Sequence, residues 1–438
     1  SDLDIVKQII MNYTRFINSV SLARKPSPIR VLTAIALSSP PSMISMAGGN
    51  PNVKTFPIQS ATLTLRNGTV IHIGEELMQQ ALQYSPTPGF PGLLEWVRGL
   101  QDHIHTPPLL NKKNHPGAVD ILITNGSQDG IARALESMVS PKDTVLIETP
   151  SYPGTLAILK PLGCRLLPVQ SDKHGMDPDH LQHILSNWKP SHALDPSSDI
   201  PKLLYCIPNG GNPTGYGLTA ERKKKIYQLA REYSLLILED DPYYYLQFSK
   251  PRIPSLLSMD EDGRVIRFDS FSKLISSGLR LGFVSGPKPI IERMQLHMQA
   301  TVMHASGLSQ ITLLQILQGW GYEGFKQHAD KVTEFYRERK NHCVAAAKKH
   351  LTGLAEWSEP SGGMFLWLKL KVPDTFKMIT VKAREKDVLF VPGNAFMLDD
   401  QAPSQYVRAA YSMCTAEQMD LAFERLASLI REEQLNPS

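Results

Sequence analysis

Short apolar runs and longer amphipathic stretches alternate along the chain from about residue 59 to residue 311, without internal repeats. Apolar runs of about four to eight residues are typical of strands covered on both faces, as in a parallel sheet. The stretches between them have apolar residues at helical spacing, for example 129–138. This alternation predicts an α/β fold. Its clearest strands are 119–123, 144–148, 203–207, 235–239 and 265–269.

After about residue 331 the pattern changes. A long helix-like stretch comes first, and residues 363–369 and 406–411 then alternate between apolar and polar positions, as half-buried strands do. We therefore expect a smaller α+β domain at the C-terminal end.

A lysine follows the predicted strand 265–269, in the sequence Ser270-Phe271-Ser272-Lys273, and Arg280 comes shortly after it. Burial and nearby cations lower the pKa of a lysine, which lets its ε-amine attack an aldehyde near neutral pH. Serine hydroxyls and a guanidinium at the same turn suit a phosphate dianion. A buried lysine in this setting predicts pyridoxal 5'-phosphate (PLP), which has both an aldehyde and a phosphate. Taken alone, the motif is more typical of a solvated turn.

Two other predicted strands end in residues that PLP requires. Asp240 follows 235–239, at the strand end where open α/β sheets bind ligands, and its carboxylate would keep a pyridine nitrogen protonated. Asn212, in the loop after 203–207, would direct its amide at a ring oxygen. The alternatives are that Asp240 or Asp241 caps a turn and that the Asn212 loop is an ordinary turn.

Two further positions are candidates for cofactor contacts. Residues 119–123 lead through a glycine into a helix, so the backbone amides near Ser127 and Gln128 would favour an anion; the alternative is a simple N-cap serine. Tyr152, after 144–148, would stack on the cofactor ring, with a core aromatic as the alternative.

Four motifs, in this order and at these spacings, resemble the fold-type I PLP-dependent aminotransferases: Asn212-Pro213-Thr214-Gly215, Asp240-Asp241-Pro242-Tyr243, Ser270-Phe271-Ser272-Lys273 and Leu279-Arg280-Leu281-Gly282. The resemblance covers nearly the whole chain from about Met11. Lys273 and Arg280 are seven residues apart (280 − 273), one fewer than in the aspartate aminotransferase branch. The chain is thus more similar to the kynurenine/alpha-aminoadipate (2-aminoadipate) and fungal aromatic aminotransferases, as residues 27–30, 81–86, 353–357 and 363–367 also indicate.

The resemblance implies an architecture of three parts. These are an N-terminal arm (1–41), a large PLP-binding domain with a mixed, mostly parallel seven-stranded sheet (42–330) and a small α+β domain (331–438). It also implies a homodimer with the active site at the subunit interface. The implied reaction is transamination of 2-aminoadipate, kynurenine, an aromatic amino acid or methionine with a 2-oxo acid, 2-oxoglutarate above all.

The resemblance further implies a role for each site residue. Lys273 would form the internal aldimine and move the proton, Asp240 would pair with the pyridine nitrogen, and Tyr243 with the phenolic oxygen. The cofactor contacts would be Ser127, Gln128, Tyr152, Asn212, Asp240, Tyr243, Ser270, Ser272, Lys273 and Arg280, with Tyr84 reaching the neighbouring subunit's phosphate. The substrate contacts would be Arg408, which clamps the α-carboxylate, with Arg30, Gly49 and Asn212. Without the resemblance, Tyr84 would be expected in the core and Arg408 beside a nearby acid.

Composition sets wider bounds. The net charge of +4 is mild and the basic residues are spread along the chain, so the sequence does not predict nucleic-acid binding. The four cysteines lack paired ligand spacing, which argues against structural zinc and favours a reducing compartment. No apolar run approaches the roughly 18 residues that span a bilayer, so no membrane partner is predicted.

Residues 11–30 contain four basic residues and no acid, a composition compatible with a mitochondrial signal. Residues 1–10 lie ahead of the usual start of the family. We expect the mitochondrial matrix, with the cytoplasm as the alternative. Two other functions stay open: a transcription regulator on the same fold, which would need a DNA-binding module, and a PLP-dependent lyase acting on cysteine conjugates, which would use the same residues.

Overall fold

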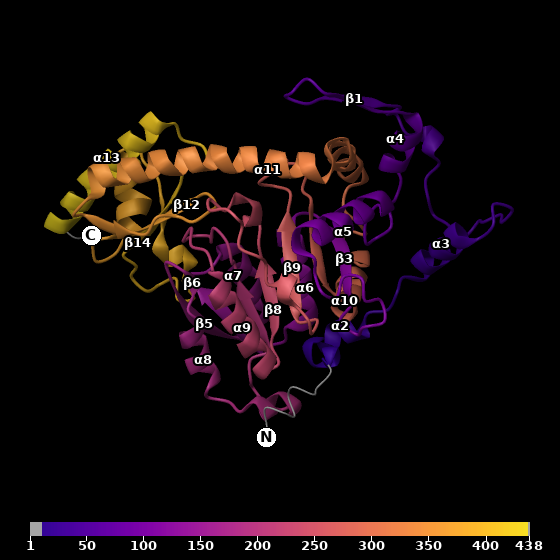
Figure 1. Cartoon of the computed structure of the whole chain (residues 1–438), viewed down its shortest axis with the longest axis horizontal. Coiled ribbons are helices and arrows are strands. Elements are labelled where there is room, and N and C mark those ends of the chain that lie inside the picture. Colours follow the sequence, from indigo (N-terminus) through magenta and orange to yellow (C-terminus); the bar gives the residue numbers. More distant parts are fainter. Residues whose placement is uncertain (1–10, 437–438) are drawn as a thin grey trace. The chain divides into compact units, whose positions relative to one another are not determined.

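The computed structural model describes residues 11–436, and the contacts between residues divide the chain into two compact units (Figure 1). We name each unit after one of its predicted site residues. Among the described residues, the Lys273 unit comprises 11–140 and 257–326. The Asp240 unit comprises 141–256 and 327–436. Residues 1–10, part of the predicted arm, lie outside the described residues.

The Lys273 unit contains three antiparallel strands in the order β3 (Val119–Thr124), β10 (Gly282–Pro287) and β9 (Val265–Ser270). Helix α6 (Ser127–Met138) packs on all three strands, α10 (Lys288–Gln299) packs on β3 and β10, and α5 (Pro91–His105) packs on β3. Every residue of β10 is buried, as expected for a strand with neighbours on both edges.

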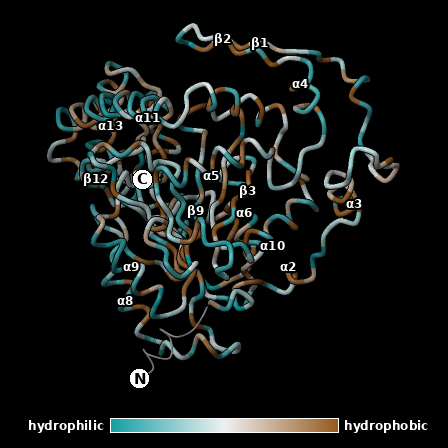
Figure 2. The backbone as a smooth tube through the Cα atoms, turned by 45° about the vertical axis from the view of Figure 1, so that its right-hand side comes forward, coloured by the Kyte–Doolittle hydropathy of each residue, from teal (hydrophilic) through white to brown (hydrophobic). Residues whose placement is uncertain are grey.

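The N-terminal part of the Lys273 unit is less compact. It contains α2 (Ser19–Ala23), α3 (Pro28–Ser38), the hairpin of β1 (Ala61–Thr64) and β2 (Val70–Ile73), and α4 (Glu75–Leu82). Helix α2 packs against α6 and α10, whereas α3 and the hairpin project away from the strands of their own unit (Figures 1 and 2).

The Asp240 unit contains five strands in the order β8 (Leu236–Asp240), β7 (Leu203–Cys206), β4 (Thr144–Thr149), β5 (Arg165–Asp172) and β6 (Gly175–Met176). All pairs are parallel except β5 with β6. The connecting helices are α7 (Pro153–Leu159), α8 (Pro178–Leu185) and α9 (Ala220–Glu232). Every residue of β7 and β8 is buried, as the apolar runs in their sequences predicted for strands covered on both faces.

The C-terminal part of the Asp240 unit is a second layered structure. Helix α11 (Gly307–Leu351) is broken at Gly321, whose φ of 65° is not helical, and its residues after Lys326 belong to this unit. An antiparallel sheet follows, in the order β11 (Ala355–Trp357), β12 (Phe365–Leu370), β14 (Tyr406–Ala410) and β13 (Val391–Pro392). Its apolar side chains form one core with those of α12 (Ala383–Glu385) and α13 (Ala416–Leu435).

Short helical turns complete the described residues. The 3-10 turns are Tyr13–Phe16, Val53–Thr55, Lys160–Leu162, Pro190–Leu194, Tyr244–Leu246, Leu257–Met259 and Gly393–Phe396, and Met378–Lys382 is a π-helical turn.

The predicted strands are confirmed to within two residues at each end, and the alternation of strands and helices is confirmed. Strands β3 to β10 number eight among the described residues, because two-residue β6 adds to the seven implied by the resemblance. The long C-terminal helix is the part of α11 after the break at Gly321, so it begins earlier than residue 331. Within residues 11–436 we find no helix long and apolar enough to cross a membrane, and no cluster of three or more metal-ligating side chains.

Candidate active site

Strand register in the Lys273 unit brings the serine–lysine turn and the start of α6 to the same place. Gly282, the first residue of β10, pairs with Ser270 at the end of β9 and with Thr124 at the end of β3. A Cβ atom on Gly282 would lie 2.8 Å from the backbone nitrogen of Ser127. The predicted phosphate contacts Ser270 and Ser127 are therefore close neighbours.

Arg280 lies across the start of α6. Its Nη1 donates to Ser272 Oγ at 3.4 Å, its Nη2 donates to the Asn125 carbonyl at 3.4 Å, and its φ of 53° is left-handed. A side chain at Gly126 would overlap the Arg280 guanidinium, so glycine is required there for the close approach as well as for its φ of 81°.

The helix start is available to an anion. Gly126 is the N-cap of α6, Ser127 is the first helical residue, and α6 has no side-chain cap, which excludes the N-cap alternative for Ser127. Exposed amides at a helix start, Gln128 at its second position, serine hydroxyls and a guanidinium together suit a phosphate dianion. These residues fit the phosphate of PLP.

Lys273 follows Ser272 at this turn, as predicted. One expectation about it was wrong: the Lys273 side chain is partly exposed and not buried. The turn lies at the end of β9, and the lysine is half-buried among the described residues.

Asp240 ends β8 in the Asp240 unit and is nearly inaccessible to solvent. The buried Tyr205 hydroxyl, on neighbouring β7, donates to Asp240 Oδ2 at 2.5 Å. Burial and the Asp240 carboxylate raise the pKa of Tyr205 well above its ordinary value, so the phenol keeps its proton and donates it. Asp241 instead accepts two hydrogen bonds from Asn209 Nδ2, at 2.9 and 3.2 Å. Asp240 is therefore the better candidate for the pyridine partner.

Tyr243 is buried just after Asp240, and burial together with the Asp240 carboxylate raises the pKa of Tyr243. Its ring meets Phe365 edge to face at 6.1 Å, and Tyr152 is close enough to influence its titration. The ring of Tyr152 covers Gly154, where a Cβ atom would lie 2.5 Å from it. Tyr152, Asp240 and Tyr243 are thus brought together.

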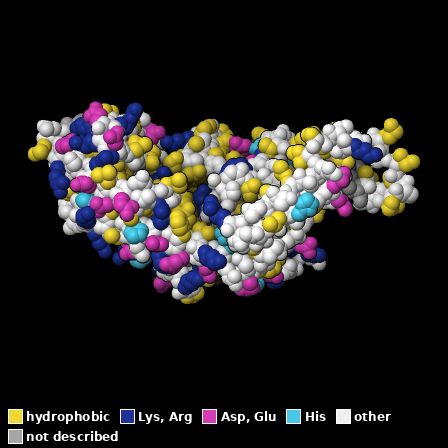
Figure 3. Space-filling model, turned by 90° about the horizontal axis from the view of Figure 1, so that it is seen from above, with side chains coloured by type: hydrophobic (Ala, Val, Ile, Leu, Met, Phe, Trp, Pro, Cys, Tyr) yellow, Lys and Arg dark blue, Asp and Glu magenta, His cyan; other side chains and the backbone are white. Residues whose placement is uncertain are grey.

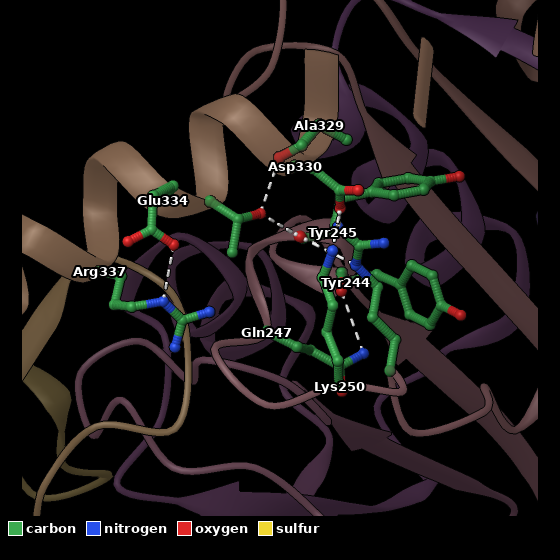
Figure 4. A network of polar contacts seen from close by, with 10 residues as sticks. Tyr244, Tyr245, Gln247, Lys250, Ala329, Asp330, Glu334 and Arg337 are labelled. Atoms are coloured by element: carbon green, nitrogen blue, oxygen red, sulfur yellow. Dashed lines mark hydrogen bonds and ion pairs between the residues drawn. The ribbon is translucent and has the colours of Figure 1, made fainter. Parts of the chain in front are cut away.

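The loop after Tyr243 is fastened to α11 by polar contacts (Figure 4). Thr333 Oγ1 donates to the Tyr245 carbonyl at 2.7 Å, and Asp330 forms ion pairs with Lys250 at 2.9 Å and Arg252 at 2.7 Å. The contacts join Tyr245, Lys250 and Arg252 to two residues of α11, Asp330 and Thr333. The backbone that follows Tyr243 is therefore fixed to a helix of the same unit.

Arg408 on β14 lies against Asn212. Its Nη1 donates to Asn212 Oδ1 at 2.8 Å, and its guanidinium lies over the Phe365 ring at 4.2 Å and near the Phe396 ring at 5.3 Å. Arg408 Nε is buried and has no hydrogen-bond partner within residues 11–436, and burial lowers the pKa of this guanidinium from its ordinary value. The alternative of a nearby acid as partner is not observed among the described residues. This donor set fits a carboxylate that is not part of the chain.

The Asn212 loop is held by contact between two glycine-rich turns. Gly210 has a φ of 53°, and a Cβ atom there would lie 2.6 Å from the backbone nitrogen of Gly363. The loop therefore packs on the start of β12, the strand whose Trp367 pairs with Arg408. Glycine at position 210 is required for both the backbone angle and the contact.

Three more predicted site residues line one cavity of about 1030 Å3 in the Lys273 unit: Arg30, Gly49 and Tyr84. Arg30 Nη1 donates to the Ser85 carbonyl at 2.9 Å, and its buried Nη2 has no hydrogen-bond partner in the described part of the chain. Tyr84 is 49% exposed, which excludes the core tyrosine that the sequence alone would favour.

Sequence reasoning missed Tyr205 and Phe396. Tyr205 lies in a strand in which every residue is buried, so periodicity gave no reason to single it out. Phe396 lies in a short 3-10 turn, twelve residues before Arg408 (408 − 396) and outside its strand. Neither had a local motif that could have found it.

The fold and these two groups of residues define a class of protein. Residues 43–426 match the model of the aminotransferase class I and II family, and the chain belongs to that family. It is an aminotransferase with pyridoxal 5'-phosphate as its cofactor.

Three known proteins are similar to this chain over nearly its whole length. The mitochondrial kynurenine/alpha-aminoadipate aminotransferase of Mus musculus is 52% identical over 423 residues, which are 96% of this chain and all of that protein. The aminotransferase Aro8 of Candida albicans has a TM-score of 0.84 at 25% identity, covering 97% of this chain and 99% of that one. A kynurenine aminotransferase of Pyrococcus horikoshii has a TM-score of 0.74 at 27% identity, covering 96% and 98%. The predicted fold-type I class and its branch are confirmed.

Proposed function

We propose that this chain transfers the amino group of 2-aminoadipate, kynurenine, an aromatic amino acid or methionine to a 2-oxo acid, with 2-oxoglutarate as the main acceptor. The name of the 52% identical relative supports kynurenine and 2-aminoadipate as donors. The observation that carries the proposal is the half-buried Arg408 guanidinium, which is held by Asn212 and two aromatic rings and whose buried Nε has no hydrogen-bond partner among the described residues. Every amino acid and oxo acid has the α-carboxylate that this guanidinium would bind.

The residues divide the work of the reaction. PLP, when bound, supplies the ring that accepts electrons from the substrate α-carbon. Lys273 would hold the cofactor and would move a proton as general acid and base. Asp240 would keep a proton at the pyridine nitrogen, and Tyr205 would orient this carboxylate by its hydrogen bond. Tyr243 and Asn212 would donate to the phenolic oxygen.

The remaining residues hold and orient the cofactor and the substrate. The phosphate contacts are Ser127, Gln128, Ser270, Ser272 and Arg280, and Tyr152 covers the cofactor ring. Arg408 fixes the substrate α-carboxylate by two hydrogen bonds, whereas Arg30 and Gly49 contact the part of the substrate that differs between donors. The three-part division of the chain at about residues 41 and 330 stays a prediction.

A second copy of this chain is the proposed partner. The segment from α3 to the following loop exposes a row of apolar side chains, among them Ile29 at 60%, Ile44 at 89% and Met46 at 97%. Figure 2 shows α3 with hydrophobic residues, and Figure 3 shows hydrophobic side chains on the surface of the projecting end. Apolar surface of this extent marks an interaction site. A homodimer would cover it and would bring Tyr84 to the neighbouring subunit's phosphate.

The proposed location is the mitochondrial matrix. The supporting observations are the basic, acid-free composition of residues 11–30 and the mitochondrial name of the Mus musculus relative.

A panel of amino donors assayed with 2-oxoglutarate tests the function. Arg408→Lys keeps the charge but loses the planar fork, so every donor should lose about 30- to 1000-fold in kcat/KM, from about 2–4 kcal/mol. Arg30→Ala should change the ranking of donors and weaken acidic ones most. If Arg408→Lys changed the ranking and left small donors unaffected, the two roles would be wrong. Release of ammonia and pyruvate from cysteine conjugates, without transfer to the acceptor, would instead identify a lyase.

A further inference from the structure

Three helices of the Lys273 unit meet at a junction with more buried hydrogen-bonding groups than it pairs. Helices α2 and α10 both pack against α6, and α2 also contacts α10. Five buried side-chain atoms at this junction have no hydrogen-bond partner among the described residues: Ser21 Oγ, Arg24 Nη1, Arg133 Nε, Ser137 Oγ and His297 Nδ1. Leaving buried donors unpaired is costly, above all when they are charged. Their concentration in one place indicates a missing acceptor.

The groups on α6 and α10 lie on faces that point toward each other. Arg133 and Ser137 are four residues apart on α6, as are Arg293 and His297 on α10, so each pair occupies one face of its helix. Thr301, just after α10, joins the two helices: its Oγ1 accepts from Arg133 Nη1 at 2.6 Å and donates to the His297 carbonyl at 3.2 Å. Arg133 and His297 therefore share one junction.

The groups on α2 are tied to the same place. Asn18 caps α2 by accepting from the Ser21 backbone nitrogen at 2.8 Å, and its own backbone nitrogen donates to the Ser137 carbonyl at 3.0 Å. Arg293 Nη1 donates to the carbonyls of Ser21 at 3.1 Å and Arg24 at 3.3 Å. All five unpaired atoms thus belong to residues linked by short hydrogen-bonded connections.

Positive charge exceeds negative charge at the junction. The charged groups that face it are three arginines and two carboxylates: Arg24, Arg133, Arg293, Asp129 and Glu136. Arg133 pairs with Asp129 at 2.8 Å, whereas Arg24 and Arg293 have no carboxylate partner among the described residues. Burial and the cations of Arg24 and Arg133 lower the pKa of His297 to about 4, so its ring is neutral at pH 7. The junction therefore has a net charge of +1 (3 − 2).

We propose that this junction binds a small inorganic anion, with chloride as the physiological ligand. Serine hydroxyls and guanidinium N–H groups can all donate to one anion. A water molecule would accept at most two of these bonds and would leave the charge uncompensated. None of the five residues lines the large cavity of this unit, which suits a single ion over a larger molecule. Bound there, the ion would tie α2, and so the start of the arm, to α6 and α10.

Bromide replaces chloride in such sites and can be located by its anomalous scattering. Crystals of the PLP-loaded enzyme prepared in sodium bromide should show an anomalous peak within hydrogen-bonding distance of Arg24, Arg133 and Ser137. In solution, the melting temperature of the PLP-loaded enzyme should rise by about 1–2 °C for each tenfold increase in chloride at saturation. Sodium gluconate at the same ionic strength serves as the control, because gluconate is a much larger anion than chloride.

Variants separate a specific ion from general salt effects. Arg24→Gln should abolish the chloride response, whereas Arg66→Gln, which removes the same charge from an exposed position of this unit, should keep it. The effect of Ser137→Ala depends on whether an ion is bound at the junction. If an ion is bound, the variant should bind chloride more weakly. If no ion binds, the variant only removes an unpaired hydroxyl, and the protein should be as stable as the wild type or more stable.

Three results would overturn the proposal. One is density at the junction that refines as water without anomalous signal. Another is a full chloride response in Arg24→Gln. The third is binding at crystal concentration only, with a bromide peak but no difference between chloride and gluconate in solution.

Discussion

Replacing Tyr205 by phenylalanine removes a single hydroxyl beside the candidate pyridine partner. The hydroxyl donates to Asp240 Oδ2 at 2.5 Å, and both side chains are almost inaccessible to solvent. A hydrogen bond to a charged group contributes about 1.5–3 kcal/mol. Its loss would weaken the stabilisation of the ionised Asp240 by that amount. Because this carboxylate holds the proton on the pyridine nitrogen, kcat should fall about 10- to 150-fold.

Two measurements separate this effect from a loss of stability. Turnover is measured per bound cofactor, and the free energy of unfolding is measured in urea. Tyr13→Phe is the matched control: it also deletes a buried tyrosine hydroxyl, which donates to the Gly263 carbonyl at 2.7 Å and contacts no candidate site residue. Both variants should lose about 1–2 kcal/mol of stability, but only Tyr205→Phe should lose turnover. Equal turnover in the two variants would refute the role of Tyr205.

Three other substitutions test individual residues. Lys273→Ala should abolish turnover and the covalent adduct that borohydride forms with PLP; an adduct at another lysine would contradict the assignment. Asp240→Asn should still bind cofactor but lose most exchange of the substrate α-proton with solvent, and wild-type exchange would point to Asp241. Burial raises the pKa of Glu148 to about 8, so the folded protein keeps a proton that the unfolded chain loses above about pH 4.5. Stability should therefore fall between about pH 4.5 and 8, and Glu148→Gln should flatten that part of the urea-unfolding profile; an unchanged slope would contradict it.

Elements and motifs were predictable where one stretch of sequence contains the whole signal. Strand β9 and the turn after it are adjacent in the chain, so Ser270, Ser272 and Lys273 could be found together. The N-terminus of α6 was predictable for the same reason, because Gly126 and Ser127 directly follow a buried strand. In both places the chemistry lies within a few residues of the end of a strand.

Contacts between distant elements were not predictable in this way. The bond from Tyr205 to Asp240 depends on the pairing of β7 with β8, and fully buried strands have no periodicity that fixes their register. The partial exposure of Lys273 depends on what covers the turn and not on the motif itself. The unpaired groups at the α2–α6–α10 junction come from three separate helices. The sequence shows which residues are polar, but not which of them lack partners.

The two candidate substrate arginines differ in how firmly each is held, and this difference matches their proposed roles. Arg408 lies on a paired strand, is fixed by Asn212 and is stacked on Phe365, so its orientation is determined by the core of its unit. Arg30 lies on a projecting helix and is held by one backbone carbonyl. A rigid guanidinium suits the α-carboxylate, because that group is the same in every amino acid and its position sets the geometry of proton transfer. A guanidinium with few restraints suits the side chain, because donors of different length and charge must be accommodated there. Added restraint at Arg30 should therefore narrow the range of donors, whereas loss of restraint at Arg408 should slow all of them.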